Sequence, residues 1–427
     1  MKKVLIITYY WPPAGGPGVQ RWLKFVKYLR SFEIEPVVYV PENPSYPIID
    51  KDLEKEIPDE TRIIKKKIFE PYSLASIFSK KETETISSGI IQKEENQSSI
   101  QKMMLYIRGN FFIPDARKFW INPSVKFLER EIEKENFDVI ITTGPPHSLH
   151  LIGLKLKERL NIKWIADFRD PWTQIGYHEK LKLTKSSRRK HEALEKQVLN
   201  SADHLITTSF TTKNEFISKT STPIEVITNG FDSEINHSET KNEKFEIAHI
   251  GSLLSGRNPE NLWKALKELL DENAEFRNKF RLTLAGKLSE EVLESIRENK
   301  LQDHLANKGY VSHTRAIEMQ REASVLLLIE INSEETRGII PGKIFEYLAS
   351  KSPILAIGPK NWDAQKIIAE TDAGKFFLYE ETSAIKSHIM SLFQKFISNE
   401  MMSVSHDIEQ YHRKLLTGKL ANLIKNV

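Results

Sequence analysis

Continuous apolar runs that alternate with helical segments constrain the fold of this chain most. The runs "KVLIITY" (3–9) and "FDVIITTG" (137–144) carry apolar or β-branched residues at nearly every position. The segment "VQRWLKFVKYLRSF" between them repeats its apolar residues at helical spacing instead. Strands without polar alternation are typical of parallel sheets that helices bury on both faces. The sequence therefore predicts an α/β protein built from right-handed βαβ units.

The same alternation starts again after residue 244. The runs "FEIAHIG", "FRLTLAG", "SVLLLIE" and "SPILAIG" are predicted strands, and a helical pattern follows each of them. A chain of 427 residues is too long for one core, since a domain usually takes roughly 100 to 200 residues. We predict two Rossmann-like, doubly wound domains that face a cleft, an N-terminal domain over 1–228 and a C-terminal domain over 245–400.

Three polar or amphipathic segments fall outside these domains. Residues 229–244 have no apolar period and are predicted to form the linker. Residues 80–101 are polar and poor in aromatics, which predicts a mobile insertion in the first domain. The tail 401–427 is predicted to form a C-terminal helix that can cap either domain, with Leu415, Leu416, Leu420 and Ile424 on one side.

Composition excludes several classes of protein. The chain has no cysteine, so disulfides, thiolate catalysis and zinc–cysteine sites are excluded. The formal net charge of +4 is small for this length and gives no reason to expect a nucleic-acid partner. No run reaches the ~18 apolar residues of a membrane span, and the first apolar run lacks a signal-peptide cleavage site. We expect a cytoplasmic protein.

Two further segments leave alternatives open. The segment "MMLYIRGNFFIPDARKFW" (103–120) is favoured as a helix packed on the first domain. The alternative is an exposed apolar lip for a lipid-like acceptor or for the inner face of the membrane. The basic run from Lys180 to His191 is favoured as a solvated loop, and the alternative is contact with phosphate or an anionic membrane surface.

The glycine-rich stretch "TYYWPPAGGPGVQRW" lies between the first predicted strand and the first helix. Such turns often cradle a phosphate, but Pro17 removes one amide donor and the third glycine of the dinucleotide fingerprint is missing. A dehydrogenase is therefore disfavoured. We interpret Gly15 and Gly16 as positions where the backbone approaches a ligand when two domains close.

The second domain carries the stronger anion signal. In "AHIGSLLSGRNPENL", Gly251 and Arg257 stand between a strand and a helix start, where open α/β sheets bind ligands. Arg257 can clamp a diphosphate, or it can be a surface arginine beside a helix cap. In "ETRGIIPGKIFEYLASK", a turn with Pro341 precedes Lys343 and the helix that contains Glu346. Glu346 can accept hydrogen bonds from a ribose, or it can be a first-turn residue favoured by the helix dipole.

Polar residues also follow two strands of the first domain. His147 and His150 come after "VIITTG", and Arg169 and Asp170 end the next strand. Both loops lie at carboxyl ends of strands and are predicted to face the cleft. Alternatively, the histidines are cap or packing residues, and Asp170 sets a turn before Pro171.

Taken together, these motifs resemble family 4 glycosyltransferases, which are retaining enzymes with the two-Rossmann GT-B fold. The resemblance rests on "HIGSLLSGRNPENL", "LTLAGK", "KGYVSHTRAIEMQREASVLLL", "PGKIFEYLASKSPILAIG" and "VITNGFD", and it covers nearly the whole chain. The stretches "TGPPHSLHLIGLKLK" and "WIADFRDPWT" are similar to a bacterial branch associated with surface-polysaccharide assembly.

The resemblance implies roles for individual residues. Such enzymes hold the donor diphosphate with an Arg and a Lys; Arg257 matches the Lys, whereas Ser252 stands at the Arg position. Of the family's two glutamates eight positions apart, Glu346 matches the second, which holds the ribose, and Gly338 replaces the first. Glu334, Glu335 or Arg337 can substitute for the first glutamate only in a rearranged loop.

The resemblance implies a metal-independent hexosyl or related transferase that needs no cofactor and moves a sugar from a nucleotide-sugar donor to a saccharide or lipid-linked acceptor. Fixed positive charge stabilises the leaving diphosphate. The alternatives are a nucleotide-sugar 2-epimerase and a catalytically silent GT-B scaffold. The candidate catalytic residues are Arg257, Lys343, His147 and Asp170. The candidate donor-binding residues are Gly16, Gly251, Ser252, Arg257, Ile339, Ile340, Pro341, Lys343 and Glu346. Gly15, His150 and Arg169 are assigned to the acceptor side.

Overall fold

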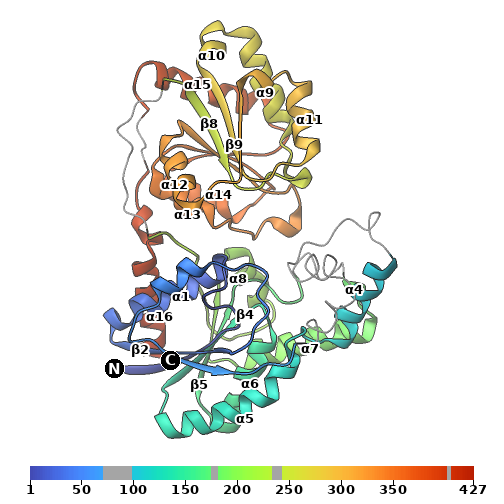
Figure 1. The fold of residues 1–427 in the computed structure, drawn as a ribbon, viewed down its shortest axis with the longest axis vertical. Coiled ribbons are helices and arrows are strands. Elements are labelled where there is room, and N and C mark those ends of the chain that lie inside the picture. Colours follow the sequence, from blue (N-terminus) through green and yellow to red (C-terminus); the bar gives the residue numbers. More distant parts are fainter. Residues whose placement is uncertain (71–98, 175–180, 233–242, 402–404) are drawn as a thin grey trace. The chain divides into compact units, whose positions relative to one another are not determined.

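The computed structural model of the protein describes residues 1–70, 99–174, 181–232, 243–401 and 405–427 (Figure 1). The chain forms two compact units. Unit 1 comprises Met1–Asn229 together with Arg413–Val427, and unit 2 comprises Gly230–His412. Most of the predicted insertion 80–101 and of the predicted linker 229–244 lies outside the described residues.

Unit 1 is built on one parallel sheet. Within the described residues this sheet has seven strands in the order β3-β2-β1-β4-β5-β6-β7. All of its strand pairs are parallel, and β1 pairs in register with both β2 and β4. The strands are β1 (Lys2–Ile7), β2 (Ile34–Pro41), β3 (Arg62–Lys66), β4 (Val139–Gly144), β5 (Lys163–Phe168), β6 (His204–Thr207) and β7 (Ile224–Val226).

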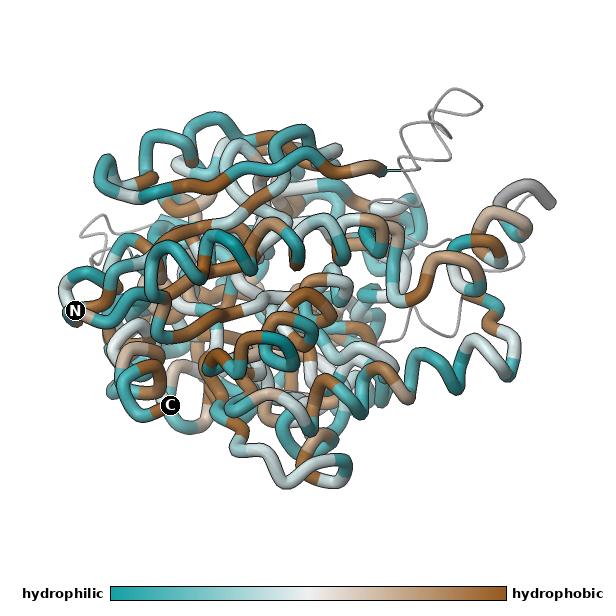
Figure 2. Tube along the Cα trace, turned by 90° about the horizontal axis from the view of Figure 1, so that it is seen from below, coloured by the Kyte–Doolittle hydropathy of each residue, from teal (hydrophilic) through white to brown (hydrophobic). Residues whose placement is uncertain are grey.

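Helices bury both faces of the unit 1 sheet. Successive strand residues enter different cores: Leu5 packs into the core on the side of α5 and α6, and Ile6 packs into the core that α1 and α16 share. This alternation explains why every position of these strands can be apolar. The helices of unit 1 are α1 (Pro17–Leu29), α4 (Ser99–Phe111), α5 (Lys118–Glu135), α6 (Ser148–Leu160), α7 (Lys185–Ser201), α8 (Phe210–Ile217) and α16 (Arg413–Asn426). In Figure 2, brown and teal stretches alternate along many helices, as expected for helices that bury one side.

The C-terminal helix α16 belongs to unit 1. Its residues Leu416, Leu420 and Ile424 are buried against α1 and the first strand. Arg413 also donates a hydrogen bond to Gln20 of α1. Leu415, which we predicted on the apolar side, is instead 51% exposed, and Leu423 is buried in the helix's packed face.

Unit 2 repeats the architecture with a second parallel sheet. Its described residues form six strands in the order β10-β9-β8-β11-β12-β13. The strands are β8 (Phe245–Ile250), β9 (Phe280–Ala285), β10 (Leu305–Gly309), β11 (Val325–Ile329), β12 (Ile354–Ile357) and β13 (Gly374–Phe377). The helices are α9 (Glu260–Glu272), α10 (Ala274–Lys279), α11 (Glu290–Glu298), α12 (His313–Glu322), α13 (Lys343–Ser350), α14 (Asp363–Glu370) and α15 (Thr382–Ile397).

In each sheet, successive strands are added toward one edge up to a certain point and toward the other edge after it. In unit 1 this point lies between β1 and β4, and in unit 2 it lies between β8 and β11. The loops after two such strands diverge to opposite sides and leave a crevice at the carboxyl edge, where ligands of open α/β sheets bind. The two parallel sheets confirm the predicted doubly wound α/β fold.

One further local prediction needs correction. The basic run from Lys180 to His191 was favoured as a loop, but its residues from Lys185 onward form the first turns of α7. Thr184 begins this helix by accepting a hydrogen bond from the backbone N–H of Ser187. No described helix is long and apolar enough to cross a membrane.

Candidate functional site

Gly251 and Lys343 meet at the carboxyl end of β8 in unit 2. Gly251 has a φ of 126°, a conformation that other residues rarely adopt. A Cβ atom added to it would lie 2.8 Å from the Nζ atom of Lys343. The absence of a side chain at residue 251 therefore lets the Lys343 ammonium group approach the end of the strand.

His249, on β8, holds the Lys343 side chain in place. Its Nδ1 atom lies 2.9 Å from the carbonyl oxygen of Leu327, and its Nε2 atom lies 3.3 Å from the Nζ atom of Lys343. A carbonyl only accepts, so Nδ1 carries the proton and Nε2 accepts from the ammonium group. Burial and the neighbouring Lys343 hold the pKa of His249 well below its usual value, which keeps the ring neutral.

Arg257 is held by a buried carboxylate that follows β11. Its Nε and Nη2 atoms donate to the same oxygen, Oε1 of Glu330, at 3.1 and 2.9 Å. Glu330 is fully buried, and its Oε1 also accepts from the backbone N–H of Ile331. Its other oxygen, Oε2, has no hydrogen-bond partner within the described residues. The pair places a guanidinium group at the crevice between β8 and β11.

The electrostatics of this crevice favour an anion. Burial and the positive charge of Arg257 lower the pKa of Lys343 to about 8, and Glu330 opposes this shift only in part. Two cations that repel each other across a partly exposed site are stabilised when a doubly charged group binds between them. The site therefore has the charge expected for a phosphate or diphosphate.

The turn before α13 presents backbone groups to the same region. Gly342 begins the helix without a side-chain cap, so the positive end of the helix dipole lies beside Lys343. Trp362 fixes the preceding loop because its buried indole donates to the carbonyl oxygen of Ile339 at 2.6 Å. Ile340 and Pro341 are partly exposed in this turn, and Ile339 is exposed.

Glu346 lies one turn further along α13. Its Oε2 atom accepts a hydrogen bond of 2.9 Å from Nε2 of Gln320, a buried residue of α12. The side chain is partly exposed, so a hydroxyl group can reach it. The Gln320 contact orients the carboxylate. A residue favoured in the first turn only by the helix dipole would not need such a contact.

Three other residues considered above have exposed side chains. Ser252, directly after Gly251, is exposed at the edge of the crevice. Glu334 and Glu335, considered above as substitutes for Gly338, lie in a short 3-10 turn with exposed side chains. Glu330 is the carboxylate that the structure places beside Arg257.

In unit 1 the predicted residues lie after β1, β4 and β5. Arg169 occupies the centre of this edge: its Nε atom donates to the carbonyl oxygen of Gly144, and its Nη2 atom donates to that of Pro145. A Cβ atom on Gly18 would lie 1.8 Å from Nη1 of Arg169. A side chain at residue 18 would therefore displace the guanidinium group of Arg169.

Asp170 differs from its neighbour Asp167. Burial raises the pKa of Asp170 above its usual value, although Arg169 lowers it in part. Burial would also raise the pKa of Asp167, but the ion pair with Arg21 at 3.0 Å and hydrogen bonds from Thr143 and Trp22 lower it. Asp167 is a structural charge, whereas Asp170 is partly exposed beside it.

His147 and His150 are both packed inside unit 1. His147 stacks on Trp172 with ring centroids 5.0 Å apart and is only 4% exposed. His150 is fully buried, its Nδ1 atom lies 2.9 Å from Oγ1 of Thr142, and burial lowers its pKa to about 3. A direct contact between His150 and an acceptor would need this packing to open.

Gly15 and Gly16 come directly before α1. Gly15 donates a backbone hydrogen bond to Ile48, and a Cβ atom there would lie 2.9 Å from the Ile48 side chain. Gly16 has a φ of 108° and no described atom within 4 Å of an added Cβ. Both glycines are explained within unit 1 by packing and by backbone conformation, and their predicted approach to a ligand stays a prediction.

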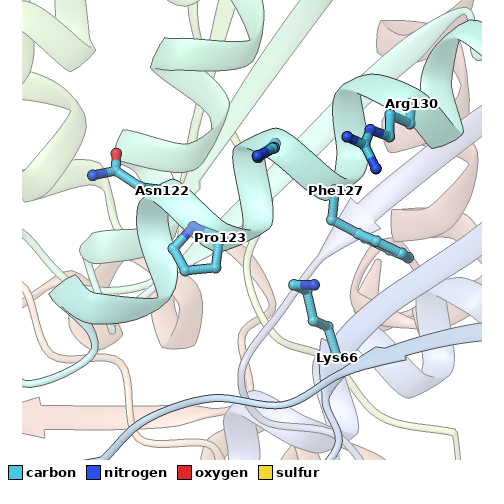
Figure 3. A pocket seen from close by; sticks show the side chains of 6 residues that line it. Lys66, Asn122, Pro123, Phe127 and Arg130 are labelled. Atoms are coloured by element: carbon cyan, nitrogen blue, oxygen red, sulfur yellow. The ribbon is translucent and has the colours of Figure 1, made fainter.

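The described residues also form a groove of about 550 Å³ between β3 and α5. It contains none of the predicted site residues. In Figure 3, Asn122, Pro123, Phe127 and Arg130 project from α5, and Lys66 extends from β3 toward Phe127. The Lys66 ammonium group lies 4.7 Å from the centroid of the Phe127 ring. This basic groove is separate from the crevices at the strand ends described above.

The sequence did not lead us to predict two residues of the unit 2 crevice. Glu330 ends the apolar run "SVLLLIE", and His249 lies within "FEIAHIG". A charged or titratable residue at the carboxyl end of a buried strand was the available signal. We assigned neither residue to the site because each lies in an apolar run that predicts a strand.

Comparison with known proteins places the fold. Residues 92–235, about a third of the chain, match the family described as Glycosyltransferase Family 4. A comparison with curated proteins gives no match.

Solved structures are similar over the whole chain. HepE from Anabaena in complex with UDP has a TM-score of 0.62 at 14% identity, with 100% of both chains covered. A TarM G117R mutant from S. aureus in complex with Fondaparinux, alpha-GlcNAc-glycerol and UDP has a TM-score of 0.59 at 12% identity, over 99% of this chain and 100% of TarM. WaaG, a glycosyltransferase involved in lipopolysaccharide biosynthesis, has a TM-score of 0.54 at 13% identity, over 99% of this chain and 100% of WaaG. The chain therefore has the two-domain, Rossmann-like GT-B fold.

Proposed function

We propose that the protein is a retaining glycosyltransferase. It moves a sugar from a nucleotide-diphosphate donor to a saccharide or lipid-linked acceptor in the synthesis of a cell-surface polysaccharide. The observation that carries this proposal is the meeting of Arg257, Lys343 and the amino terminus of α13 at the crevice of unit 2. The family match and the UDP in the HepE and TarM structures support the same assignment.

The donor diphosphate binds between Arg257 and Lys343. Glu330 accepts from Nε and Nη2 of Arg257 through one oxygen, which fixes the guanidinium plane and leaves its Nη1 edge to meet phosphate. His249 accepts from Lys343 and holds its ammonium group at Gly251. Charge-assisted hydrogen bonds from groups fixed in this way stabilise the leaving diphosphate more than the intact donor.

The nucleoside lies toward Glu346. Its carboxylate, oriented by Gln320, accepts hydrogen bonds from the vicinal hydroxyls of the ribose. Ser252 and the turn at Ile339, Ile340 and Pro341 border the same donor site. This arrangement distinguishes a nucleotide from an isolated diphosphate, because only the nucleotide supplies the hydroxyls.

The reaction needs no metal ion in this proposal. The bond between the anomeric carbon and the donor phosphate oxygen breaks, and the acceptor oxygen bonds to the anomeric carbon on the same face. The acceptor proton passes to an oxygen of the leaving diphosphate. Asp170 of unit 1, which is partly exposed, orients the acceptor, and Gly15 and Arg169 border the same surface. His147 and His150 are packed beneath this surface and support it.

Product analysis tests this proposal. The full chain is incubated with nucleotide sugars, with and without an extract of saccharide and lipid-linked acceptors, and both sugar transfer and anomeric configuration are followed. Transfer with retained configuration is expected, and Asp170→Asn is expected to lower transfer without lowering donor affinity. Conversion of the donor in the absence of any acceptor would identify an epimerase instead. Donor binding without turnover under every condition would identify a silent scaffold.

A further inference from the structure

We propose that unit 1 carries a docking surface for anionic lipid bilayers, formed by α4, the start of α5 and the first turns of α7. This inference does not depend on the transferase proposal, because it concerns a surface outside both strand-end crevices. We call the apolar part the α4 surface. It consists of Met103, Tyr106, Ile107, Phe111, Phe69 and Phe119, which are all exposed.

The α4 surface presents large apolar side chains to solvent. Met103 is 57% exposed, Phe111 is 63% exposed and Phe69 is 55% exposed. The ring of Phe119 on α5 lies edge to face with that of Phe112, directly after α4, with centroids 6.2 Å apart, so the surface continues from α4 onto α5. Phe119 also lies edge to face with Phe69, with centroids 5.6 Å apart. Single exposed apolar residues are common, but a cluster of this kind marks an interaction surface.

The opposite side of α4 fixes this orientation. Leu105 is buried, and a Cβ atom on Gly109 would lie 2.7 Å from the carbonyl oxygen of Leu181. Asn110 donates to the carbonyl oxygen of Lys182 and accepts from the backbone N–H of Thr184. The helix is therefore attached to the segment before α7, and its exposed face is a defined surface.

This attachment brings the apolar surface beside a cluster of cations. We call the exposed side chains Lys182, Lys185, Arg188, Arg189 and Lys190 the α7 cluster. No Asp or Glu occurs between residues 180 and 191, nor between residues 97 and 114. In Figure 1, α4 lies next to the start of α7 and far from α16 within unit 1. Positive charge thus gathers on one side of the apolar surface.

Further cations flank the aromatic rings. The Lys118 ammonium group lies 5.3 Å from the centroid of Phe112 and 5.1 Å from that of Phe119. The basic groove lies further along α5 and adds Lys66, Lys126 and Arg130. Long cationic side chains that cover aromatic rings can turn outward to lipid phosphates while the rings enter the headgroup region.

Charge complementarity favours a bilayer over a second copy of the chain. Two copies of the α7 cluster brought face to face would repel each other, whereas anionic headgroups neutralise it. Aromatic and aliphatic side chains bordered by Lys and Arg match the boundary between headgroups and acyl chains. A surface of this kind suits an enzyme whose acceptor is anchored in the membrane.

Vesicle flotation of the full chain tests the inference. The wild type should float with phosphatidylcholine vesicles that contain one third phosphatidylglycerol and not with pure phosphatidylcholine, and added salt should weaken the binding. The triple variant Arg188→Gln, Arg189→Gln, Lys190→Gln should bind about a hundredfold more weakly, since each cation near an anionic surface favours binding by about fivefold. Ile107→Ser with Phe111→Ser should weaken binding at least tenfold.

Matched controls separate the docking surface from general effects. Lys264→Gln, Lys308→Gln and Lys360→Gln remove the same charge from exposed positions of unit 2. Ile217→Ser with Leu415→Ser removes side chains of similar exposure elsewhere on unit 1. Both controls should float like the wild type, and all variants should keep the wild-type melting temperature.

Three outcomes would overturn the inference. Flotation that is equal for the α7 variant and its unit 2 control would remove the role of the α7 cluster. Absence of wild-type flotation on anionic vesicles would show that the surface does not bind an anionic bilayer. Sedimentation that shows a wild-type dimer, which Ile107→Ser with Phe111→Ser converts to a monomer, would assign the α4 surface to a second copy of the chain.

Discussion

Arg257 and Glu330 form an ion pair at the crevice of unit 2, with Nη2 of Arg257 2.9 Å from Oε1 of Glu330. Glu330 is fully buried, whereas the Arg257 side chain is 32% exposed. The buried partner holds the exposed one in place, so Arg257 has both a structural contact and a surface that faces ligand. A single substitution cannot separate these two roles.

Arg257→Ala is expected to weaken binding of a nucleoside diphosphate at least tenfold, since charge-assisted hydrogen bonds contribute ~1.5–3 kcal/mol. The same change should lower the free energy of unfolding by ~1–3 kcal/mol, because it leaves a buried carboxylate without its partner. Titration calorimetry and denaturant unfolding measure the two effects.

The double variant Arg257→Ala with Glu330→Ala separates the effect on nucleotide affinity from the effect on stability. It should recover much of the lost stability but none of the lost affinity. The exposed Arg281 on β9 provides the control, and Arg281→Ala should change neither quantity. Full affinity in the double variant would show that Arg257 does not contact the nucleotide.

Binding should also depend on pH through Lys343. Burial and Arg257 lower the pKa of its ammonium group from 10.5 to about 8, so its charge is present below that value and is lost as the pH rises through it. Nucleotide affinity should therefore fall between about pH 7 and pH 9 in the wild type. In Lys343→Met, affinity should be lower throughout and nearly constant over that interval. A wild-type profile as flat as that of the variant would contradict the role of Lys343.

Gly251→Ala tests the approach of Lys343 to the strand end. The added Cβ would lie 2.8 Å from Nζ of Lys343 in a backbone conformation with φ of 126°, so we expect the ammonium group to move and affinity to fall at least tenfold. Gly309 provides a matched control: its φ is 58°, and an added Cβ would meet nothing within 4 Å. Gly309→Ala should cost ~1 kcal/mol of stability and leave nucleotide affinity unchanged. Equal losses of affinity in both variants would point to backbone strain alone.

Glu346→Ala tests the ribose contact. Affinity for a ribonucleoside diphosphate should fall about tenfold or more, because two hydrogen bonds to a carboxylate are lost. Affinity for inorganic pyrophosphate should not change, since that ligand has no hydroxyls for Glu346 to hold. Gln320→Ala should give a smaller loss in the same direction. A similar loss for pyrophosphate would mean that the substitution disturbs α13 as a whole.

The sequence predicts the strands of this protein better than it predicts the contacts between side chains that are distant in the chain. Strands such as "VIITTG" are apolar at nearly every position because both faces of the sheet are covered, and this local pattern identifies them. The Arg257–Glu330 pair joins residues 73 positions apart. Gly18, in the first turn of α1, lies against Arg169, which follows β5, far away in the sequence. Such pairings depend on strand order, which the apolar pattern does not specify.

The α7 segment shows a second limit. Its basic residues suggested a solvated loop because charge runs usually lie in solvent. Thr184, followed by Ser187 at capping distance, begins a helix there, and the cations remain exposed on it. Composition thus predicted the exposure of these residues but not their secondary structure.

The central claim is that Arg257 and Lys343 of unit 2 bind the diphosphate of a nucleotide sugar. Thermal unfolding of the wild type, Arg257→Ala and Lys343→Met in the presence of UDP-, GDP- and ADP-sugars tests it most directly, because a ligand of the folded state raises its melting temperature. We predict that one class of nucleotide sugar stabilises the wild type and that neither variant responds to it. Equal stabilisation of all three proteins, or no response of the wild type to any nucleotide sugar, would contradict the claim.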